Sequence, residues 1–488
     1  MAAVLSRDAR TGEVRAQVGV EADTAAVDAA VRAAHATLDT LADRPRRAAL
    51  LRAAAEAVES RADELIAAAD AETALGVPRL TGELARVAYQ FRFFADIVDD
   101  GAFLGVVIDP PDPTAVPPRP ELRRWKVPIG TVAVFAASNF PFAFSVPGGD
   151  TASALAAGCP VVVKAHPDHP QTSALVAETL RVAAEQVGLS ADVLTLIHGY
   201  QAGIDLVRHP LIAAVGFTGS IPGGRALFDL AAARPSPIPF YGELGSLNPV
   251  LVTERAAQAR PDEIANGLVA SYTLGQGQFC TKPGLVLVPE GPAGDELTRS
   301  AKETAAQAAP GALLDARMRE HFLAGFAARA AAPGVRTLAA AAAAPTDDAP
   351  QAVHAGLLEV DADDLGGDLL EECFGPVTVL VRYRDAADAE TVLSRLGGNL
   401  TATLHAEPGE PDAAAWLARL SRFAGRVIFG GWPTGVAVAP AMTHGGPYPA
   451  TTTPTTSVGG TAIERWLRPV TYQTVPADLL PPELSKEP

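Results

Sequence analysis

The feature that most constrains the fold is a regular alternation of short apolar runs with amphipathic segments between about residues 130 and 242. Strands are predicted at 131–136, 160–164, 193–197 and 213–217, with helices at 147–157 and 171–187. Such alternation is typical of a parallel, doubly wound sheet, because the crossover helices cover both of its faces. These sheets bind ligands beyond the carboxyl ends of their strands. Functional residues are therefore expected where these strands end.

Alternation of the same kind continues from 243 to about 440, and it indicates a second α/β domain. The chain has 488 residues, more than one ordinary hydrophobic core needs, so two or three domains are expected. Amphipathic helices are predicted within 24–71, the second of them at 45–71, and at 82–99. An alanine-rich insert at 338–350 is expected to form a surface loop or a helix end.

The charge and the apolar pattern exclude several classes of protein. A net charge of −17 argues against nucleic-acid binding, which needs a basic patch. An anionic substrate would need a local cation. No apolar run approaches the roughly 20 residues of a membrane span, and the first residues lack the order of a signal peptide. We therefore expect a cytoplasmic protein that does not bind membranes.

One of only three cysteines stands out as a candidate nucleophile. Cys280 follows the glycine-rich sequence Gly-Gln-Gly-Gln-Phe, whose glycines allow a ligand to approach the backbone closely. Cys159, in contrast, lies in an apolar run typical of a structural cysteine. The three cysteines offer neither a disulfide framework nor a metal-binding CxxC pair.

A cysteine that attacks a carbonyl needs a base and an oxyanion donor. Glu243, 37 residues before Cys280, stands among apolar and small residues, which should raise its pKa towards that of a general base. Asn139 follows a predicted buried strand, and its amide can donate to an oxyanion.

These segments resemble a known family. Ser-Asn-Phe-Pro, Phe-Thr-Gly-Ser, Glu-Leu-Gly-Ser, Gln-Phe-Cys-Thr and Glu-Glu-Cys-Phe-Gly-Pro occur in the order typical of the aldehyde dehydrogenase superfamily. Lys-Ala-His-Pro-x-His-Pro, Gly-Gly-x-Pro-Thr-Gly-Val and the C-terminal tail resemble its 2-oxoglutarate (α-ketoglutaric) semialdehyde dehydrogenase, or 2,5-dioxopentanoate dehydrogenase, group. The resemblance implies NAD(P)-dependent oxidation of an aldehyde to an acid through a thiohemiacetal and a thioester at Cys280. No metal is required.

The resemblance also implies the architecture: an α/β fold with a Rossmann-type dinucleotide-binding domain, an α/β catalytic domain and a small oligomerisation arm. The expected parts are the dinucleotide-binding domain at 1–115 and 131–242, the arm and tail at 116–130 and 464–480, the catalytic domain at 243–440 and a Thr/Pro/Gly-rich return segment at 441–463. The strand at 121–130 leaves an edge that needs cover. A homodimer or homotetramer is therefore expected.

Candidate cofactor residues lie at two predicted strand ends and in one later segment. Lys164 ends one strand, and the turn containing Gly219, Ser220 and Gly224 opens a helix whose amides can take a pyrophosphate. By the resemblance, Glu372 binds the nicotinamide ribose and Phe374 packs beside the nicotinamide.

The residues after Lys164 bear on the choice of cofactor. Pro167 replaces a glutamate that commonly holds the adenosine ribose, while Lys164 and His166 can attract a 2′-phosphate. NADP is therefore expected first, with NAD as the alternative. Because no third metal ligand lies near His166 and His169, these residues are expected in a solvent-exposed turn.

Candidate substrate residues lie on the helix at 82–99 and next to Asn139. Arg86 is the expected cation for a substrate carboxylate, with Gln90 one turn further on, and Phe140 is the expected apolar contact. The alternative interpretation of Arg86 is a structural ion pair. The alternative functions are a succinate semialdehyde or broad-specificity aldehyde dehydrogenase, an enzyme passing its acyl group to coenzyme A, and a catalytically idle protein on the same fold.

Overall fold

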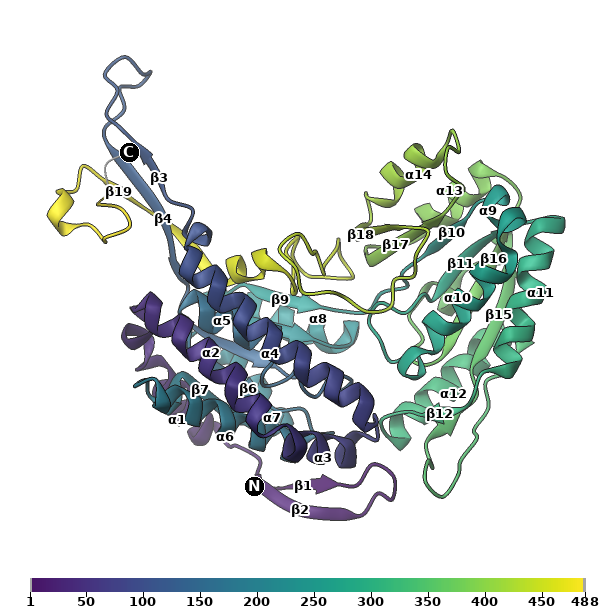
Figure 1. The fold of residues 1–488 in the computed structure, drawn as a ribbon, viewed down its shortest axis with the longest axis horizontal. Helices are drawn as coiled ribbons and strands as arrows, with labels where there is room; N and C mark the ends of the chain where they lie inside the picture. Colours follow the sequence, from purple (N-terminus) through teal and green to yellow (C-terminus); the bar gives the residue numbers. More distant parts are fainter. Residues whose placement is uncertain (1, 486–488) are drawn as a thin grey trace.

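The computed structural model describes residues 2–485, and it contains two large, mainly parallel sheets with helices on both faces. Figure 1 shows the two sheet-containing halves next to each other, with a narrow arm extending away from the first. Both sheets follow the predicted alternation. The fold is mixed α/β, as the sequence predicts.

The first half is built on a parallel five-stranded sheet. In spatial order its strands are β7 (Leu194–Ile197), β6 (Val161–Lys164), β5 (Thr131–Phe135), β8 (Ile212–Thr218) and β9 (Phe240–Glu243). Along β5, Val132 and Val134 pack into one hydrophobic core while Ala133 and Phe135 pack into the other. This alternation shows that the sheet is buried on both faces.

Eight helices cover this sheet. They are α1 (Thr24–His35), α2 (Arg44–Ser60), α3 (Ala62–Thr73), α4 (Val77–Asp100), α5 (Gly149–Ala157), α6 (Pro170–Gln186), α7 (Tyr200–Arg208) and α8 (Ile221–Ala232). The single helix expected at 45–71 is wrong, because Arg61 leaves helical geometry (φ −109°, ψ 19°) between α2 and α3. Helix α4 begins five residues before the expected Gly82, since Gly76 at φ 87° and Pro78 in the first turn start it there.

The second half is built on a seven-stranded sheet. In spatial order its strands are β13 (Arg336–Ala339), β15 (Gly356–Asp361), β16 (Val377–Tyr383), β11 (Leu285–Pro289), β10 (Val250–Val252), β17 (Asn399–His405) and β18 (Ala424–Phe429). Only β13 runs antiparallel to its neighbour. The first residues of the alanine-rich insert, Leu338 and Ala339, belong to this edge strand and not to a helix end.

Six helices flank the second sheet. They are α9 (Glu254–Ala259), α10 (Pro261–Thr273), α11 (Pro292–Gln307), α12 (Ala316–Ala330), α13 (Ala386–Ser394) and α14 (Ala413–Leu420). Separate hydrophobic clusters form on its two faces, one with α10 and α11 and the other with α12, α13 and α14.

The remaining strands form small antiparallel sheets. The arm contains β19 (Leu467–Gln473), β4 (Leu122–Pro128) and β3 (Val107–Asp109) in that order. Because β3 pairs with β4, the arm sheet includes residues before 116. The others pair β1 (Ala3–Arg7) with β2 (Val14–Val20), and β12 (Gly311–Ala312) with β14 (Ala352–Val353).

The chain between β18 and β19 returns from the second half across the first. Thr452 exchanges hydrogen bonds with Gly242, and Thr451 forms a bridge with Glu243, so this segment runs antiparallel to the end of β9. Further on, buried Trp466 donates its indole N–H to Ser153 of α5 (2.8 Å). The return segment is therefore held directly against the end of the strand that carries Glu243.

Candidate active site

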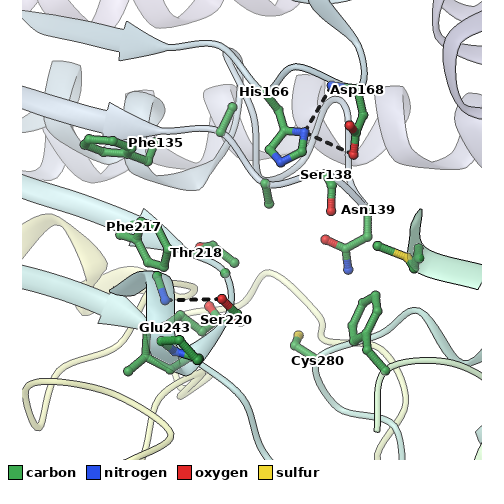
Figure 2. A pocket seen from close by; sticks show the side chains of 18 of the residues that line it. Phe135, Ser138, Asn139, His166, Asp168, Phe217, Thr218, Ser220, Glu243 and Cys280 are labelled. Carbon is green, nitrogen blue, oxygen red and sulfur yellow. Dashed lines mark hydrogen bonds and ion pairs between the residues drawn. The ribbon is translucent and has the colours of Figure 1, made fainter. Parts of the chain in front are cut away.

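A cavity of about 990 Å³ lies at the carboxyl ends of β5, β6 and β8 and extends to the second half of the molecule. Figure 2 shows Cys280, Glu243 and Asn139 around it, together with side chains from the ends of β6 and β8. Most of the residues expected from the sequence line this one cavity: Asn139, Phe140, Lys164, His166, Gly219, Ser220, Glu243, Cys280, Glu372 and Phe374. Gly224, Arg86 and Gln90 do not line it.

The loop that carries Cys280 needs its glycines. Gly275 and Gly277 have positive φ angles of 55° and 65°. A Cβ atom at Gly277 would lie 2.2 Å from the carbonyl oxygen of Gly375. Only glycine therefore lets this loop pack against the segment that follows Glu372.

Two buried polar side chains hold the Cys280 loop in place. Asn248 donates its amide to the carbonyl oxygens of Cys280 (2.8 Å) and Lys282 (2.9 Å). Lys282 in turn donates its ammonium to the carbonyl oxygens of Cys373 (2.8 Å) and Val377 (2.9 Å). The nucleophile loop and the loop carrying Glu372 are thus joined by one buried lysine.

Cys280 and Glu243 meet at a histidine that the sequence analysis did not select. His444 Nε2 lies 2.8 Å from Glu243 Oε1 and 3.4 Å from Cys280 Sγ. The other carboxylate oxygen of Glu243 accepts a hydrogen bond from Ser457 (2.7 Å). Glu243 and His444 are 3% and 1% exposed, so these contacts are shielded from solvent.

The return segment positions His444 and Ser457. A Cβ atom at Gly445 would lie 2.2 Å from the Thr455 carbonyl oxygen, and one at Gly446 would lie 2.1 Å from that of Asn399. The Gly-Gly pair after His444 is therefore required for close packing. The one sequence feature that marks His444 is the pair of glycines after it, and the residue lies far from any predicted strand or helix.

The expectation of a raised pKa for Glu243 is wrong. Burial does raise it, but the charge and hydrogen bond of His444, followed by the Ser457 hydroxyl and the Cys280 thiol, outweigh burial and lower the pKa of Glu243. Burial and then the Glu243 carboxylate raise the pKa of the Cys280 thiol well above its usual value. At neutral pH these shifts leave the Glu243 carboxylate ionised and the Cys280 thiol protonated.

Asn139 sits beside the nucleophile loop. Its side-chain amide donates to the carbonyl oxygen of Gln278 (2.9 Å), which leaves the second amide hydrogen for another acceptor. Arg79 donates to the carbonyl oxygen of Asn139 (2.6 Å) and lies over the rings of Phe140 and Phe279, 5.0 Å from each centroid. The arginine thus ties the Asn139 turn to the Cys280 loop.

The turn between β8 and α8 has the form expected for an anion site. Ser220 caps the helix, since its hydroxyl accepts from the Gly223 N–H (3.3 Å). Gly219 faces the cavity, whereas Gly224 packs on Leu244, where a Cβ atom would lie 2.2 Å from a leucine methyl group. The role of Gly224 is therefore close packing of the helix against the chain after β9.

The segment after β6 differs from the solvent-exposed turn that was expected. His169 is fully buried and its Nε2 lies 2.9 Å from the Ala137 carbonyl oxygen, because the side chain fills the space behind the Asn139 turn. His166 Nδ1 accepts the backbone N–H of Asp168 (3.2 Å), and burial lowers the pKa of His166 well below its usual value. His166 is thus a neutral ring at the cavity wall.

Asp168 brings a carboxylate into the cavity that the sequence analysis did not use. Its Oδ2 is buried, lies 3.3 Å from His166 Nδ1, and has no hydrogen-bond partner among residues 2–485. Since that nitrogen already accepts the Asp168 N–H, it offers this oxygen no hydrogen. Lys164 lines the same part of the cavity.

Glu372 and Phe374 line the cavity as expected. Burial raises the pKa of Glu372 to about 7. A Cβ atom at Gly245 would lie 2.7 Å from its carboxylate, so this glycine makes room for the glutamate. The glycine at 219, the capped helix start, Glu372 and the unpartnered Asp168 oxygen together fit a dinucleotide with a phosphate bridge and two riboses.

Arg86 and Gln90 lie behind this cavity on α4. The guanidinium of Arg86 lies 5.4 Å from the ring centroid of Phe144, which lines the cavity, and its Nε and Nη2 atoms are buried without a partner in the described chain. Gln90 is 2% exposed, and its side chain lies so close to Gly149 of α5 that a Cβ atom there would be 3.3 Å from Gln90 Nε2. Arg86 therefore makes no ion pair within residues 2–485, whereas Gln90 packs between helices.

A cysteine, a carboxylate and an amide around a dinucleotide-shaped cavity are the parts of an aldehyde-oxidising site. Residues 3–446 match the aldehyde dehydrogenase family, and the chain belongs to it. It is accordingly an NAD(P)-dependent oxidoreductase acting on aldehydes.

Two relatives share more than 40% of their residues with this chain over most of its length. An α-ketoglutaric semialdehyde dehydrogenase from Azospirillum brasilense is 49% identical over 449 residues, which cover 90% of this chain and 85% of that protein. One from Acinetobacter baylyi is 43% identical over 445 residues, covering 89% and 84%.

Solved structures share the fold at lower identity. The γ-glutamyl-γ-aminobutyraldehyde dehydrogenase of Burkholderia cenocepacia has a TM-score of 0.82 at 23% identity and covers 96% of this chain and 92% of its own. Aldehyde dehydrogenase C of Pseudomonas syringae has a TM-score of 0.82 at 22% identity, with 97% and 93% covered. The predicted aldehyde dehydrogenase fold is confirmed.

Proposed function

We propose that this enzyme oxidises 2-oxoglutarate semialdehyde to 2-oxoglutarate. Two relatives, 49% and 43% identical to this chain, carry the name of that activity. The observation that carries the proposal is Arg86, whose two buried, unpartnered N–H atoms lie within electrostatic range of Cys280. Once the Phe144 ring, which separates the guanidinium from the cavity, turns aside, a substrate with its aldehyde at Cys280 and a carboxylate at the other end can satisfy both donors.

In the first step Cys280 attacks the aldehyde. Its proton passes to Glu243, directly or through His444, which lies within reach of both groups. The free amide hydrogen of Asn139 and the backbone N–H of Cys280 stabilise the oxyanion of the thiohemiacetal. When bound, the oxidised dinucleotide supplies the hydride acceptor.

Glu243 releases the thiol proton to solvent, and in the second step the ionised carboxylate acts as general base for hydrolysis of the thioester. His444 and Ser457 keep the carboxylate ionised and oriented towards the nucleophile. Water then receives the acyl group and the acid is released. The retained Glu243 favours hydrolysis over acyl transfer to coenzyme A.

The choice between NAD and NADP rests on the residues after β6. Pro167 and Lys164 favour NADP by the sequence argument. Asp168 supports the opposite preference, because its unpartnered oxygen can accept from a ribose 2′-hydroxyl and repels a 2′-phosphate. We therefore place NAD first and NADP second, the reverse of the order expected from the sequence.

The assembly that we propose is a homodimer or homotetramer joined through the arm. The edge strands β3 and β19 project from the body in Figure 1, and Val106 and Val107 are 40% and 41% exposed. A second copy would cover these edges. No helix within residues 2–485 is long and apolar enough to cross a membrane. We propose the cytoplasm as the location, and the domain boundaries given above as the functional division, with β3 assigned to the arm.

Two other functions are the alternatives that the experiment must separate. A succinate semialdehyde or broad-specificity dehydrogenase would use the same catalytic residues and differ at the substrate end. A catalytically idle protein would bind dinucleotide without turnover.

A panel of four aldehydes separates these functions. Formation of reduced dinucleotide is measured with 2-oxoglutarate semialdehyde, succinate semialdehyde, glutaraldehyde and propionaldehyde, each with NAD and with NADP. The proposal predicts strong preference for the first aldehyde and for NAD, both abolished in Cys280→Ser. Equal rates with all four would contradict the substrate, and silence with all four would favour the idle protein.

A further inference from the structure

Three different metal-ligating side chains converge in the described chain at Cys280, His444 and Glu243. Their ligand atoms, one sulfur, one imidazole nitrogen and one carboxylate oxygen, all lie within 4.8 Å of one another. They come from three distant parts of the chain. No step of the proposed reaction needs a cation there.

The spacing is close to that of a zinc site. Four-coordinate zinc binds cysteine sulfur at about 2.3 Å, histidine nitrogen at about 2.0–2.1 Å and carboxylate oxygen at about 2.0–2.2 Å. Tetrahedral angles then place sulfur and nitrogen about 3.5 Å apart, and nitrogen and oxygen about 3.4 Å apart. Here the distances are 3.4 Å and 2.8 Å. Of these two distances only the second must lengthen, as a cation replaces the proton shared by His444 and Glu243, and the sulfur and the carboxylate oxygen lie within 4.8 Å of each other.

The chemistry of the three ligands selects the kind of cation. A thiolate with an imidazole and a carboxylate suits zinc and cobalt, whereas calcium and magnesium prefer six or more oxygen ligands. The thiolate and the carboxylate together neutralise a divalent charge. Cys280 and Glu243 both line the cavity, so the fourth position is open to water.

We propose that Zn²⁺ binds at Cys280, His444 and Glu243 and inhibits the enzyme reversibly. The bound cation occupies the nucleophile and the base at once. It displaces the thiol proton and forms a Zn–S bond, with no change of oxidation state. The proposal concerns these three side chains and is independent of the identity of the aldehyde.

Cobalt binding tests the site without any turnover. The full-length enzyme, freed of metal with a chelator, is titrated with Co²⁺, and the thiolate-to-cobalt charge-transfer absorption is followed. We expect one equivalent to bind per chain, and Zn²⁺ to displace it. Zn²⁺ should also abolish aldehyde oxidation, and the chelator should restore it.

Variants assign the ligands. Cys280→Ser should lose the charge-transfer band, and His444→Gln and Glu243→Gln should each weaken Co²⁺ binding at least about tenfold, since even outer-shell partners of metal ligands contribute that much. Cys373→Ser is the matched control, because Cys373 lines the same cavity away from the cluster and its loss should leave the band unchanged. Unchanged near-UV circular dichroism would show that the variants fold. The proposal is overturned by the absence of a band in the wild-type enzyme, or by a band that survives in Cys280→Ser or in His444→Gln at full affinity.

Discussion

Replacing Arg86 by glutamine should separate acidic from neutral aldehydes. Burial lowers the pKa of Arg86, while Glu83 and then Cys280 and Glu243 raise it. Its Nε and Nη2 atoms have no partner within residues 2–485. A substrate carboxylate that reaches these donors past the Phe144 ring would accept two charge-assisted hydrogen bonds from them.

The size of the effect follows from that geometry. Truncating one partner of a buried, hydrogen-bonded charge pair costs about 2–5 kcal/mol. Since about 1.4 kcal/mol is tenfold in rate, Arg86→Gln should lower kcat/KM for 2-oxoglutarate semialdehyde by roughly 30-fold or more. Propionaldehyde has no carboxylate, so its kcat/KM should change by less than about threefold. Arg86→Lys keeps the charge but not the forked pair of donors, so its kcat/KM for 2-oxoglutarate semialdehyde should lie between those of the wild-type enzyme and Arg86→Gln.

Steady-state rates with both aldehydes are the assay. Arg92→Gln is the matched control on the same helix, because Arg92 pairs with Glu59 at the surface (2.5 and 2.6 Å) and should affect neither substrate. Equal losses of kcat/KM for the acidic and the neutral aldehyde in Arg86→Gln would refute the reasoning and make Arg86 a structural residue.

Three further predictions concern the base and the cofactor. Ser457→Ala removes a hydrogen bond to the buried Glu243 carboxylate that is worth about 1.5–3 kcal/mol. The pKa of Glu243, and with it the acidic midpoint of the pH profile of kcat, should therefore rise by about 1–2 pH units. Ser457→Thr is the control because it keeps the hydroxyl, and an unchanged midpoint in Ser457→Ala would show that Glu243 is not the base. Because the pKa of Glu372 is about 7 and its ionised form accepts ribose hydroxyls, dinucleotide affinity measured by calorimetry should rise between pH 6 and 8. That rise should vanish in Glu372→Gln, and its persistence there would assign it to another group. Asp168→Ser should raise the NADP-to-NAD ratio of kcat/KM by about tenfold or more, and an unchanged ratio would contradict its role.

Most of the residues proposed as catalytic could be singled out because they lie near a strand end or in a glycine-rich turn. Asn139 follows β5, Glu243 is the last residue of β9, and Cys280 follows the glycines of its loop. Parallel sheets bring such ends together, so separation in the sequence does not matter for them.

His444 and Ser457 could not be predicted, because neither lies at the end of a predicted strand. They lie in an irregular segment 201 and 214 residues after Glu243, with no periodicity that relates them to a sheet. Their absence from the sequence account also explains the wrong sign for the pKa of Glu243. Burial could be inferred from neighbouring residues, but the hydrogen bonds that outweigh it could not.

The Asp168 carboxylate illustrates a second limit. The sequence shows a proline where a glutamate is common, and that substitution alone favours NADP. Only the fold shows that the next residue turns its carboxylate into the cavity beside His166 (Figure 2). Local backbone geometry, which no spacing rule supplies here, changes the proposed order of cofactors.

The most direct test of the account is to trap the acyl-enzyme. Glu243→Gln keeps the nucleophile, and His444, 3.4 Å from its sulfur, remains to accept the thiol proton, so attack and oxidation should still proceed, more slowly, while hydrolysis should stop. Mixed with dinucleotide and 2-oxoglutarate semialdehyde, this variant should release a burst of one reduced dinucleotide per chain. Intact-protein mass spectrometry should then show the acyl group on Cys280. A variant that turns over at the wild-type steady rate, or that shows neither burst nor added mass while still binding dinucleotide, would contradict the roles given to Cys280 and Glu243.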